Sequence, residues 1–208
     1  DKAILSQHIG DLQNYETFDF YSNTIEKYKA LFRFSPSIIA HDLHPDYMST
    51  KYSENITAEK MPIQHHHAHI ASCMIENNIS KEIIGFSFDG TGLGDDGHIW
   101  GGEVFICDLL DYNREFHFKY LPLPGGDKAV EEPWRMGISA LYTAVGRTFL
   151  NMDLPFLKQI PLGKVEKLLD VIDKKINSPL TSSIGRVFDA VSAILGLCLY
   201  CNFDAEAP

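Results

Sequence analysis

The chain has 208 residues, of which 45% are hydrophobic and 22% are charged, as in a globular protein with a packed core. Lys and Arg number 18 against 28 Asp and Glu, so the formal net charge is -10. This acidic balance argues against nucleic acid or an anionic membrane surface as a partner, although backbone amides can still bind a small anion locally.

The cysteines and the absence of targeting signals indicate a cytoplasmic protein. Four scattered cysteines do not form the framework of a secreted disulfide protein. Cys198 and Cys201 form a lone CxxC pair, which cannot complete a four-thiolate zinc site and is predicted to be two partly buried thiols. No apolar run has the length of a membrane span, and no signal peptide is recognisable. Because the sequence starts without Met and stops at Pro208, we expect it to be part of a longer polypeptide.

The first part of the chain alternates helical and strand patterns. Apolar residues recur at Phe18, Tyr21 and Ile25 with charges between them, which is the spacing of an amphipathic helix. Short apolar runs bounded by Pro predict strands. The expected elements are a helix over residues 18–34, a strand over 37–42, a helix over 47–54, a strand over 61–64 and a helix over 65–76.

A second unit is predicted to begin after a boundary near Ser80. Residues 83–88 are apolar on both faces, as in a central strand, and the turn-rich residues 89–97 lead to a returning strand. The expected elements are strands over 83–88, 99–106 and 116–120, and helices over 131–145, 162–175 and 186–200. The sequence therefore predicts an α/β protein with units over 1–80 and 81–208.

A histidine-rich helix start suggests a metal site. The run QHHHAH at residues 64–69 places His65 and His69 four positions apart, so both imidazoles project from one helical face and can reach one ion. Asp89, a carboxylate at a strand end, is the natural third ligand, and this set suits iron(II) or zinc. His66 and His67 are expected to support the ligands or to face a substrate. The alternative is a group of solvated or hydrogen-bonded histidines.

Two further stretches suggest nucleotide contacts. The turn DGTGLG at residues 89–94 could hold a phosphate through its backbone amides, because glycines allow positive φ angles and a close approach. Its alternative is a β-hairpin turn that binds nothing. Residues 185–191 open a helix, where a helix N-terminus favours an anion and a carboxylate one turn later could hold ribose hydroxyls. The alternative there is a cap with a surface ion pair. The candidate phosphate and nucleoside residues are Gly90, Thr91, Gly92, Gly94, Gly185, Arg186 and Asp189.

These motifs together resemble one known family from end to end. The chain is similar to the Kae1-like, nucleotide-binding domain of the hydrogenase-maturation carbamoyltransferases of the HypF type, which belong to the actin-like and sugar-kinase ATPase superfamily. The matching motifs are QHIGDL (7–12), AHDLHPDY (40–47), QHHHAH (64–69), FDGTG (88–92), WGGE (100–103), LPGGD (123–127), EPWRM (132–136) and GRVFDAV (185–191). The resemblance implies parts of two actin-like lobes, with mixed central sheets flanked by helices.

The resemblance also implies an activity. Such proteins convert carbamoyl phosphate and ATP into a carbamoyl-adenylate and transfer the carbamoyl group to the C-terminal cysteine of the partner HypE, for the cyanide ligands of [NiFe]-hydrogenase. By motif, His65, His69 and Asp89 match the metal-binding set of the transfer site. The turn at residues 90–94 matches the second-lobe phosphate hairpin. Gly185, Arg186 and Asp189 match the stretch that lines the nucleoside.

The chain also departs from the family pattern. The family continues its last helix into Glu-Gly-Gln-Ala, whereas residues 203–207 read FDAEA. The first-lobe phosphate hairpin, the adenosine loop and one more metal-ligating aspartate are expected outside residues 1–208, so we expect this fragment alone to be inactive. The competing hypotheses are a non-catalytic lobe that docks a nucleotide or a partner, and a metal-dependent phosphohydrolase. The residues assign neither the native metal nor a role for the PWR motif at 133–135.

Overall fold

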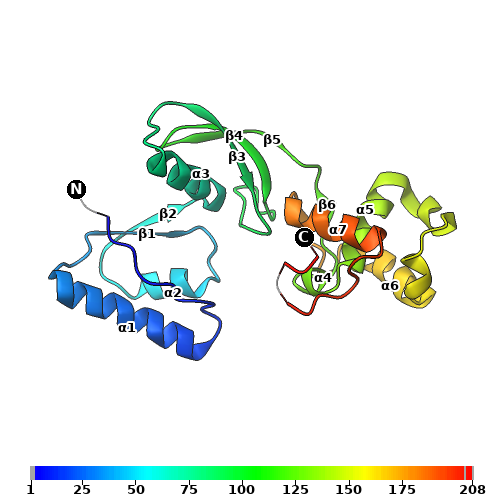
Figure 1. Cartoon of the computed structure of the whole chain (residues 1–208), viewed down its shortest axis with the longest axis horizontal. Helices are drawn as coiled ribbons and strands as arrows, with labels where there is room; N and C mark the ends of the chain where they lie inside the picture. The colour runs from blue at the N-terminus through cyan, green and yellow to red at the C-terminus, as the bar shows by residue number, and fades with distance from the viewer. Residues whose placement is uncertain (1–2, 204, 208) are drawn as a thin grey trace. The chain divides into compact units, whose positions relative to one another are not determined.

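The computed structural model describes residues 3–203 and 205–207, and the chain divides into two compact units, Asp1–Gln64 and His65–Pro208 (Figure 1). The α/β class is confirmed, with parallel strand pairing in the first unit and antiparallel pairing in the second. This division by packing falls in front of the histidine-rich helix, whereas the lobe boundary expected near Ser80 stays a prediction. None of the described helices is long and apolar enough to cross a membrane.

The first unit begins with a long amphipathic helix. Helix α1 (Tyr15–Phe32) starts after Asn14, whose side-chain oxygen accepts hydrogen bonds from the first backbone N–H groups. It ends at Arg33, which adopts a left-handed conformation with φ 52°. The helix therefore begins and ends slightly earlier than residues 18–34, because the Asn14 cap and the Arg33 conformation set its ends rather than Pro36.

Two parallel strands form the sheet of the first unit. Strand β1 (Ile38–Asp42) pairs with β2 (Glu59–Ile63), and α2 (Met48–Glu54) makes the crossover between them. The rings of Tyr21 on α1 and Tyr52 on α2 meet edge to face, with centroids 5.3 Å apart. Aromatic packing of this kind holds the two helices together within the unit.

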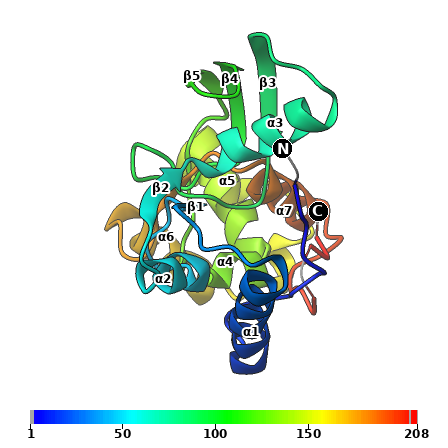
Figure 2. The ribbon, with the colours of Figure 1, turned by 90° about the vertical axis from the view of Figure 1, so that its left-hand side faces the viewer.

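The second unit opens with a helix packed on an antiparallel sheet. Helix α3 (His65–Glu76) has the predicted bounds, and Ile70 and Met74 on its inner face join a buried cluster with Trp100 and Phe105. The sheet has the order β3 (Ile83–Phe88), β4 (Gly102–Cys107) and β5 (Tyr112–His117), and Figure 2 shows the three strands side by side. A Cβ at Gly85 would lie 2.6 Å from Ile70, so the glycine lets α3 approach the sheet closely.

Two strand predictions are wrong in detail. Strand β3 was expected to be central because it is apolar on both faces, yet within the described residues it lies at the edge and β4 is central. The side chains of Ile84, Phe86 and Phe88 are 65%, 64% and 56% exposed. The strand predicted over residues 116–120 instead starts at Tyr112 and ends at His117. Its polar residues form a strand because their backbone pairs with that of β4. Pairing, rather than apolar periodicity, decides the ends of this strand.

Helices dominate the rest of the second unit. The largest buried cluster contains Trp134, Ile138, Phe149, Phe156 and Leu169. The elements are β6 (Leu121–Pro122), α4 (Lys128–Glu131), α5 (Trp134–Val145), 3-10 helices η1 (Gly146–Asn151) and η2 (Leu157–Gln159), α6 (Leu162–Asp173), β7 (Leu180–Thr181) and α7 (Ile184–Ile194). The short strands β6 and β7 pair with each other. The 3-10 helices and these two strands escaped the sequence-based prediction because each is too short to show a period.

Helix α7 ends earlier than predicted. The expected helix over residues 186–200 stops at Ile194 because Gly196 adopts φ 74°. The N–H of Leu197 donates to the carbonyl of Ser192, and the N–H of Gly196 donates to that of Ala193. This pair of bonds is a Schellman motif, for which glycine is the favoured residue. The residues after Gly196 therefore form a loop.

The PWR motif has a structural place. Pro133 caps α5, and Trp134 is 2% exposed within the main buried cluster. The Arg135 side chain donates to Glu132 at 2.6 Å, and its guanidinium lies next to Gly125 in the preceding glycine loop. Arg135 therefore connects the EPWRM motif with the LPGGD loop.

Candidate functional site

The structure brings the three predicted metal ligands together within the second unit. His65 and His69 occupy successive turns at the start of α3, and Asp89 follows directly after β3. The Nε2 atoms of His65 and His69 lie 3.0 and 3.5 Å from Oδ2 of Asp89 and 3.2 Å from each other. Ligands that share one ion at about 2.0–2.2 Å in a tetrahedral site are separated by roughly 3.3–3.6 Å, so this donor set fits a divalent metal.

Asp89 is held as an ionised carboxylate. Burial works to raise the pKa of its carboxyl, but hydrogen bonds from His65 and from the Gly90 N–H, with the nearby imidazole charges, lower this pKa to about 2. The Gly90 N–H donates to Oδ1 at 2.6 Å, which leaves Oδ2 directed at the histidines. The side chains of His65, His69 and Asp89 are 26%, 57% and 30% exposed, so a ligand can approach the group.

His66 and His67 are both buried, which favours the expected supporting role over one that faces a substrate. His66 is fully buried, with its ring 6.1 Å from that of Trp100. Burial, with a contribution from the charge of His65, lowers the pKa of His66 to about 4, so its ring is neutral at physiological pH. A ring nitrogen of His67 lies 2.8 Å from the carbonyl oxygen of Asp108. His66 therefore packs α3 against Gly92 and Trp100, and His67 joins α3 to the residue that follows β4.

The glycine turn leads into a hairpin whose positive φ angle falls at Gly97, with φ 77°, and not at the three candidate glycines. The N–H of Gly94 donates to the His98 carbonyl at 2.8 Å, and none of Gly90, Gly92 and Gly94 has a positive φ. A Cβ at Gly92 would lie 2.5 Å from the His66 ring and 3.0 Å from the His65 ring. Gly94 lies similarly close under Trp100. Gly92 and Gly94 are thus required by packing, whereas Gly90 has open space around it.

Helix α7 begins against this turn. The Ser183 hydroxyl lies 2.7 and 2.9 Å from the carbonyl oxygens of Asp89 and Gly90, and it also caps the helix by accepting from the Arg186 N–H. A Cβ at Gly185 would lie 3.1 Å from Cα of Gly90. The predicted nucleoside stretch therefore contacts the backbone of the predicted phosphate turn.

The sequence reasoning missed one carboxylate that supports the site. Glu103 is fully buried and accepts from Arg114, at 2.5 Å, from Ser182 and from the N–H groups of Gly101 and Gly102. Burial works to raise its pKa, but these donors lower the pKa below its usual value. Gly101 in turn accepts from the Asp89 N–H at 2.9 Å, so the network fixes the backbone that carries Asp89. An acidic residue inside an apolar strand was the available signal.

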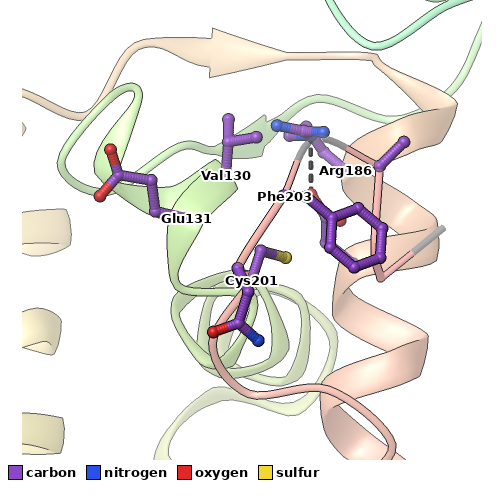
Figure 3. Close-up of a pocket in the computed structure, with 8 residues that line it drawn as sticks. Val130, Glu131, Arg186, Cys201 and Phe203 are labelled. Atoms are coloured by element: carbon purple, nitrogen blue, oxygen red, sulfur yellow. Dashed lines mark ion pairs between the residues drawn. The ribbon is translucent and has the colours of Figure 1, made fainter.

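Arg186 and Asp189 form a buried ion pair in the wall of a pocket. Nε of Arg186 lies 2.9 Å from Oδ2 of Asp189, with side chains 9% and 1% exposed, so the surface ion pair considered as an alternative is not what forms. Burial raises the pKa of Asp189 to about 6, against the opposing charge of Arg186. The pocket has a volume of about 410 Å³, and Figure 3 shows Cys201 and Phe203 facing it from the loop after α7.

Comparison with known proteins decides the family. The family model described as "Carbamoyltransferase, Kae1-like Domain, second subdomain" matches residues 85–208, and the "HypF Kae1-like domain" model matches residues 1–76. The chain belongs to the HypF Kae1-like domain family. Carbamoyltransferase HypF2 of Cupriavidus necator is 40% identical over all of this chain, which covers 26% of that protein. The probable carbamoyltransferase HypF of Methanocaldococcus jannaschii is 38% identical over 99% of this chain and 27% of its own length.

Solved HypF structures agree with this assignment. Full-length HypF in its phosphate- and nucleotide-bound form matches 97% of the chain with a TM-score of 0.91 and 42% identity, over 26% of that protein. HypF of T. kodakarensis matches 97% of the chain with a TM-score of 0.85 and 32% identity, over 28% of its length. The fold class is therefore that of the HypF Kae1-like domains. The chain spans about a quarter of the length of these relatives.

Proposed function

We propose that this chain forms the carbamoyl-transfer part of a cytoplasmic HypF-type enzyme. In this proposal the carbamoyl group passes from a carbamoyl-adenylate, made from carbamoyl phosphate and ATP, to the C-terminal cysteine of a HypE-like protein. Membership of a family whose relatives are named carbamoyltransferases supports the proposal. The observation that carries it is the convergence of His65, His69 and Asp89 beside the glycine turn.

In this proposal the metal ligands and the glycine turn have separate roles. A bound iron or zinc ion would supply Lewis-acid stabilisation of negative charge. His65 and His69 would hold that ion with their Nε2 atoms, and Asp89 would hold it as an ionised carboxylate. The half-buried Gly90 and the exposed Thr91 would contact the phosphate, while Gly92 lets the turn approach α3 and Gly94 lets it approach Trp100.

The nucleoside would lie in the pocket beside α7. Arg186 and Asp189 supply a cation and a carboxyl to its wall, and Phe203 supplies an aromatic surface (Figure 3). An aromatic ring offers stacking to a base, and a carboxylate suits ribose hydroxyls. Gly185 keeps the start of α7 close to the turn, because a Cβ there would crowd Gly90.

The test separates adenylate formation from transfer. In a full-length HypF-type enzyme that contains this sequence, we expect His69→Ala to abolish the mass gain on the acceptor cysteine while carbamoyl-phosphate-dependent release of pyrophosphate from ATP continues. His117→Ala is the matched control, because His117 is exposed and its ring lies against the Phe118 carbonyl and the Tyr120 ring, away from the three candidate ligands. Unchanged carbamoyl transfer by the His69→Ala enzyme would contradict the assignment of His69 to the transfer site.

The same measurements separate the competing functions. Phosphate-ester hydrolysis that requires His69 but no acceptor protein would favour a metal-dependent phosphohydrolase. Nucleotide binding that persists without any bound metal and without transfer would favour a docking lobe. The carbamoyl-transfer proposal instead requires that metal content and acceptor modification fall together in His69→Ala.

A further inference from the structure

The loop that follows α7 gathers three metal-binding side chains outside the site described above. The Schellman motif at Gly196 ends the helix and turns the chain, so Cys198 and Cys201 lie in the following loop rather than on a helical surface. Their Sγ atoms are 3.9 Å apart. Glu206 folds back toward them, and one ligand atom from each of the three residues lies within 4.8 Å of the others.

Hydrogen bonds hold this loop in place. The Cys201 N–H donates to the carbonyl oxygen of Glu131 at 2.8 Å, which fastens the loop to the end of α4. The backbone N–H and the side-chain amide of Asn202 both donate to the Glu206 carboxylate. The carboxylate is therefore directed by a neighbour of Cys201, an arrangement that in metal sites orients a ligand toward the ion.

The distance between the sulfurs decides what the pair can bind. A disulfide requires the two sulfurs to be about 2.05 Å apart, well below the observed 3.9 Å. Two thiolates on one tetrahedral zinc ion, each about 2.3 Å from the metal, are roughly 3.8 Å apart. We propose that Cys198, Cys201 and Glu206 form a second metal site, for zinc or a similar thiophilic divalent ion, with water in the fourth position. Binding releases the two thiol protons to solvent, and no electrons are transferred.

The site has a structural consequence for the pocket. Cys201 lines the same cavity as Arg186 and Asp189. A metal that joins Cys198, Cys201 and Glu206 ties these three side chains to one another and so restricts the wall that Cys201 lines. The proposal uses none of the residues of the histidine site and does not depend on the proposed function.

Cobalt(II) provides a direct test, because thiolate ligation gives a sulfur-to-cobalt charge-transfer band in the near ultraviolet. The intact protein is titrated with cobalt(II) under reducing, oxygen-free conditions, with a His65→Ala/His69→Ala variant to remove the histidine site. We expect the band in both proteins and its loss on addition of zinc. Cys198→Ser/Cys201→Ser should lack the band, whereas Cys73→Ser, which alters an exposed cysteine of α3, should retain it.

Glu206→Gln keeps the proposal falsifiable if the double serine variant fails to fold. This variant preserves both sulfurs and the size of the side chain but removes the anionic ligand. We expect its cobalt(II) affinity to fall at least about tenfold with the charge-transfer band still present at saturation. Unchanged affinity overturns the proposed ligand set. No band in the reduced wild-type protein, or a Cys198–Cys201 disulfide found by mass spectrometry after oxygen-free purification, overturns the metal site.

Discussion

Asp89 comes just before the turn that contacts the start of α7, and Asp189 lies within α7; burial works to raise the pKa of both carboxyls, yet the two pKa values end on opposite sides of the ordinary one. Asp89 has a pKa lowered to about 2, whereas the pKa of Asp189 is raised to about 6. The Ser183 hydroxyl contacts the Asp89 carbonyl and caps the helix that carries Asp189. The two groups therefore share a support but differ in the partners of their oxygens.

The difference lies in the donors directed at each carboxylate. Asp89 receives the Gly90 N–H and contacts two imidazoles, which stabilise its charged form more than burial destabilises it. Asp189 has one ion-pair partner, Arg186, whose Nε is not aligned for a hydrogen bond. An ion-pair partner in the same pocket wall is thus not enough to hold the pKa of a buried carboxyl at its ordinary value, and the donors aimed at the carboxylate decide the direction of the shift.

Glu103 sharpens this comparison, because it is fully buried yet receives several donors. We expect Glu103→Ala to lower the free energy of unfolding by about 3–5 kcal/mol, because the variant leaves the guanidinium of Arg114 and nearby donors without their main partner. Urea denaturation followed by tryptophan fluorescence measures the loss, since Arg114 lies 4.0 Å from the ring centroid of Trp100.

The control for Glu103 is an exposed ion pair in the same unit. Glu166 pairs with Arg147 at 2.8 Å, and both side chains are nearly half exposed. Glu166→Ala should cost no more than about 1 kcal/mol. A Glu103→Ala loss as small as that of Glu166→Ala would contradict the view that clustered donors stabilise a buried carboxylate here.

Asp189 predicts a pH dependence of stability with a defined sign. In the unfolded chain its pKa returns to about 3.8, so between about pH 4 and pH 6 the folded protein binds more protons than the unfolded chain. The contribution of Asp189 to stability is therefore fully present below pH 4 and is lost as the pH rises through 6, by up to about 3 kcal/mol. Thermal unfolding between pH 4 and pH 7 should show this decrease in the wild type, and Asp189→Asn should remove it.

Asp89, whose pKa is lowered and not raised, predicts the opposite pH dependence in the same thermal unfolding experiment. Its lowered pKa means that its contribution is present above about pH 4 and is lost as the pH falls toward 2. Asp89→Asn should therefore leave the decrease between pH 4 and pH 6 intact. If Asp89→Asn rather than Asp189→Asn removes that decrease, the roles of the two carboxyls are reversed.

Sequence periodicity predicts the long elements well but not their pairing. The bounds of α3 follow from the apolar stripe of Ile70 and Met74, which the structure buries. The edge position of β3 depends on which strands are present to pair with it, which no local pattern records. The end of α7 could have been predicted, because Gly196 is the favoured residue at a helix C-terminus.

In the candidate site too, local spacing predicts some residues, whereas others depend on contacts between distant parts of the sequence. The HxxxH spacing predicts that His65 and His69 share a face, and a carboxylate at a strand end is a natural third ligand. The roles of Glu103 and of Glu206 depend on contacts with Ser182 and the Cys198–Cys201 loop, which only the folded chain brings together. Long-range polar networks leave little trace in a single sequence.

Gly92 and Gly90 provide the smallest and most local test of how Asp89 is positioned. A methyl group at Gly92 would lie 2.5 Å from the His66 ring and 3.0 Å from the His65 ring, whereas a methyl group at Gly90 meets nothing within 4 Å. Gly92→Ala should therefore cost about 1–2 kcal/mol of stability and weaken zinc binding measured by calorimetry, because it displaces His65 from Asp89. Gly90→Ala is the matched control and should change neither. Equal zinc affinity in both variants would mean that the close approach of the turn does not position the histidine pair.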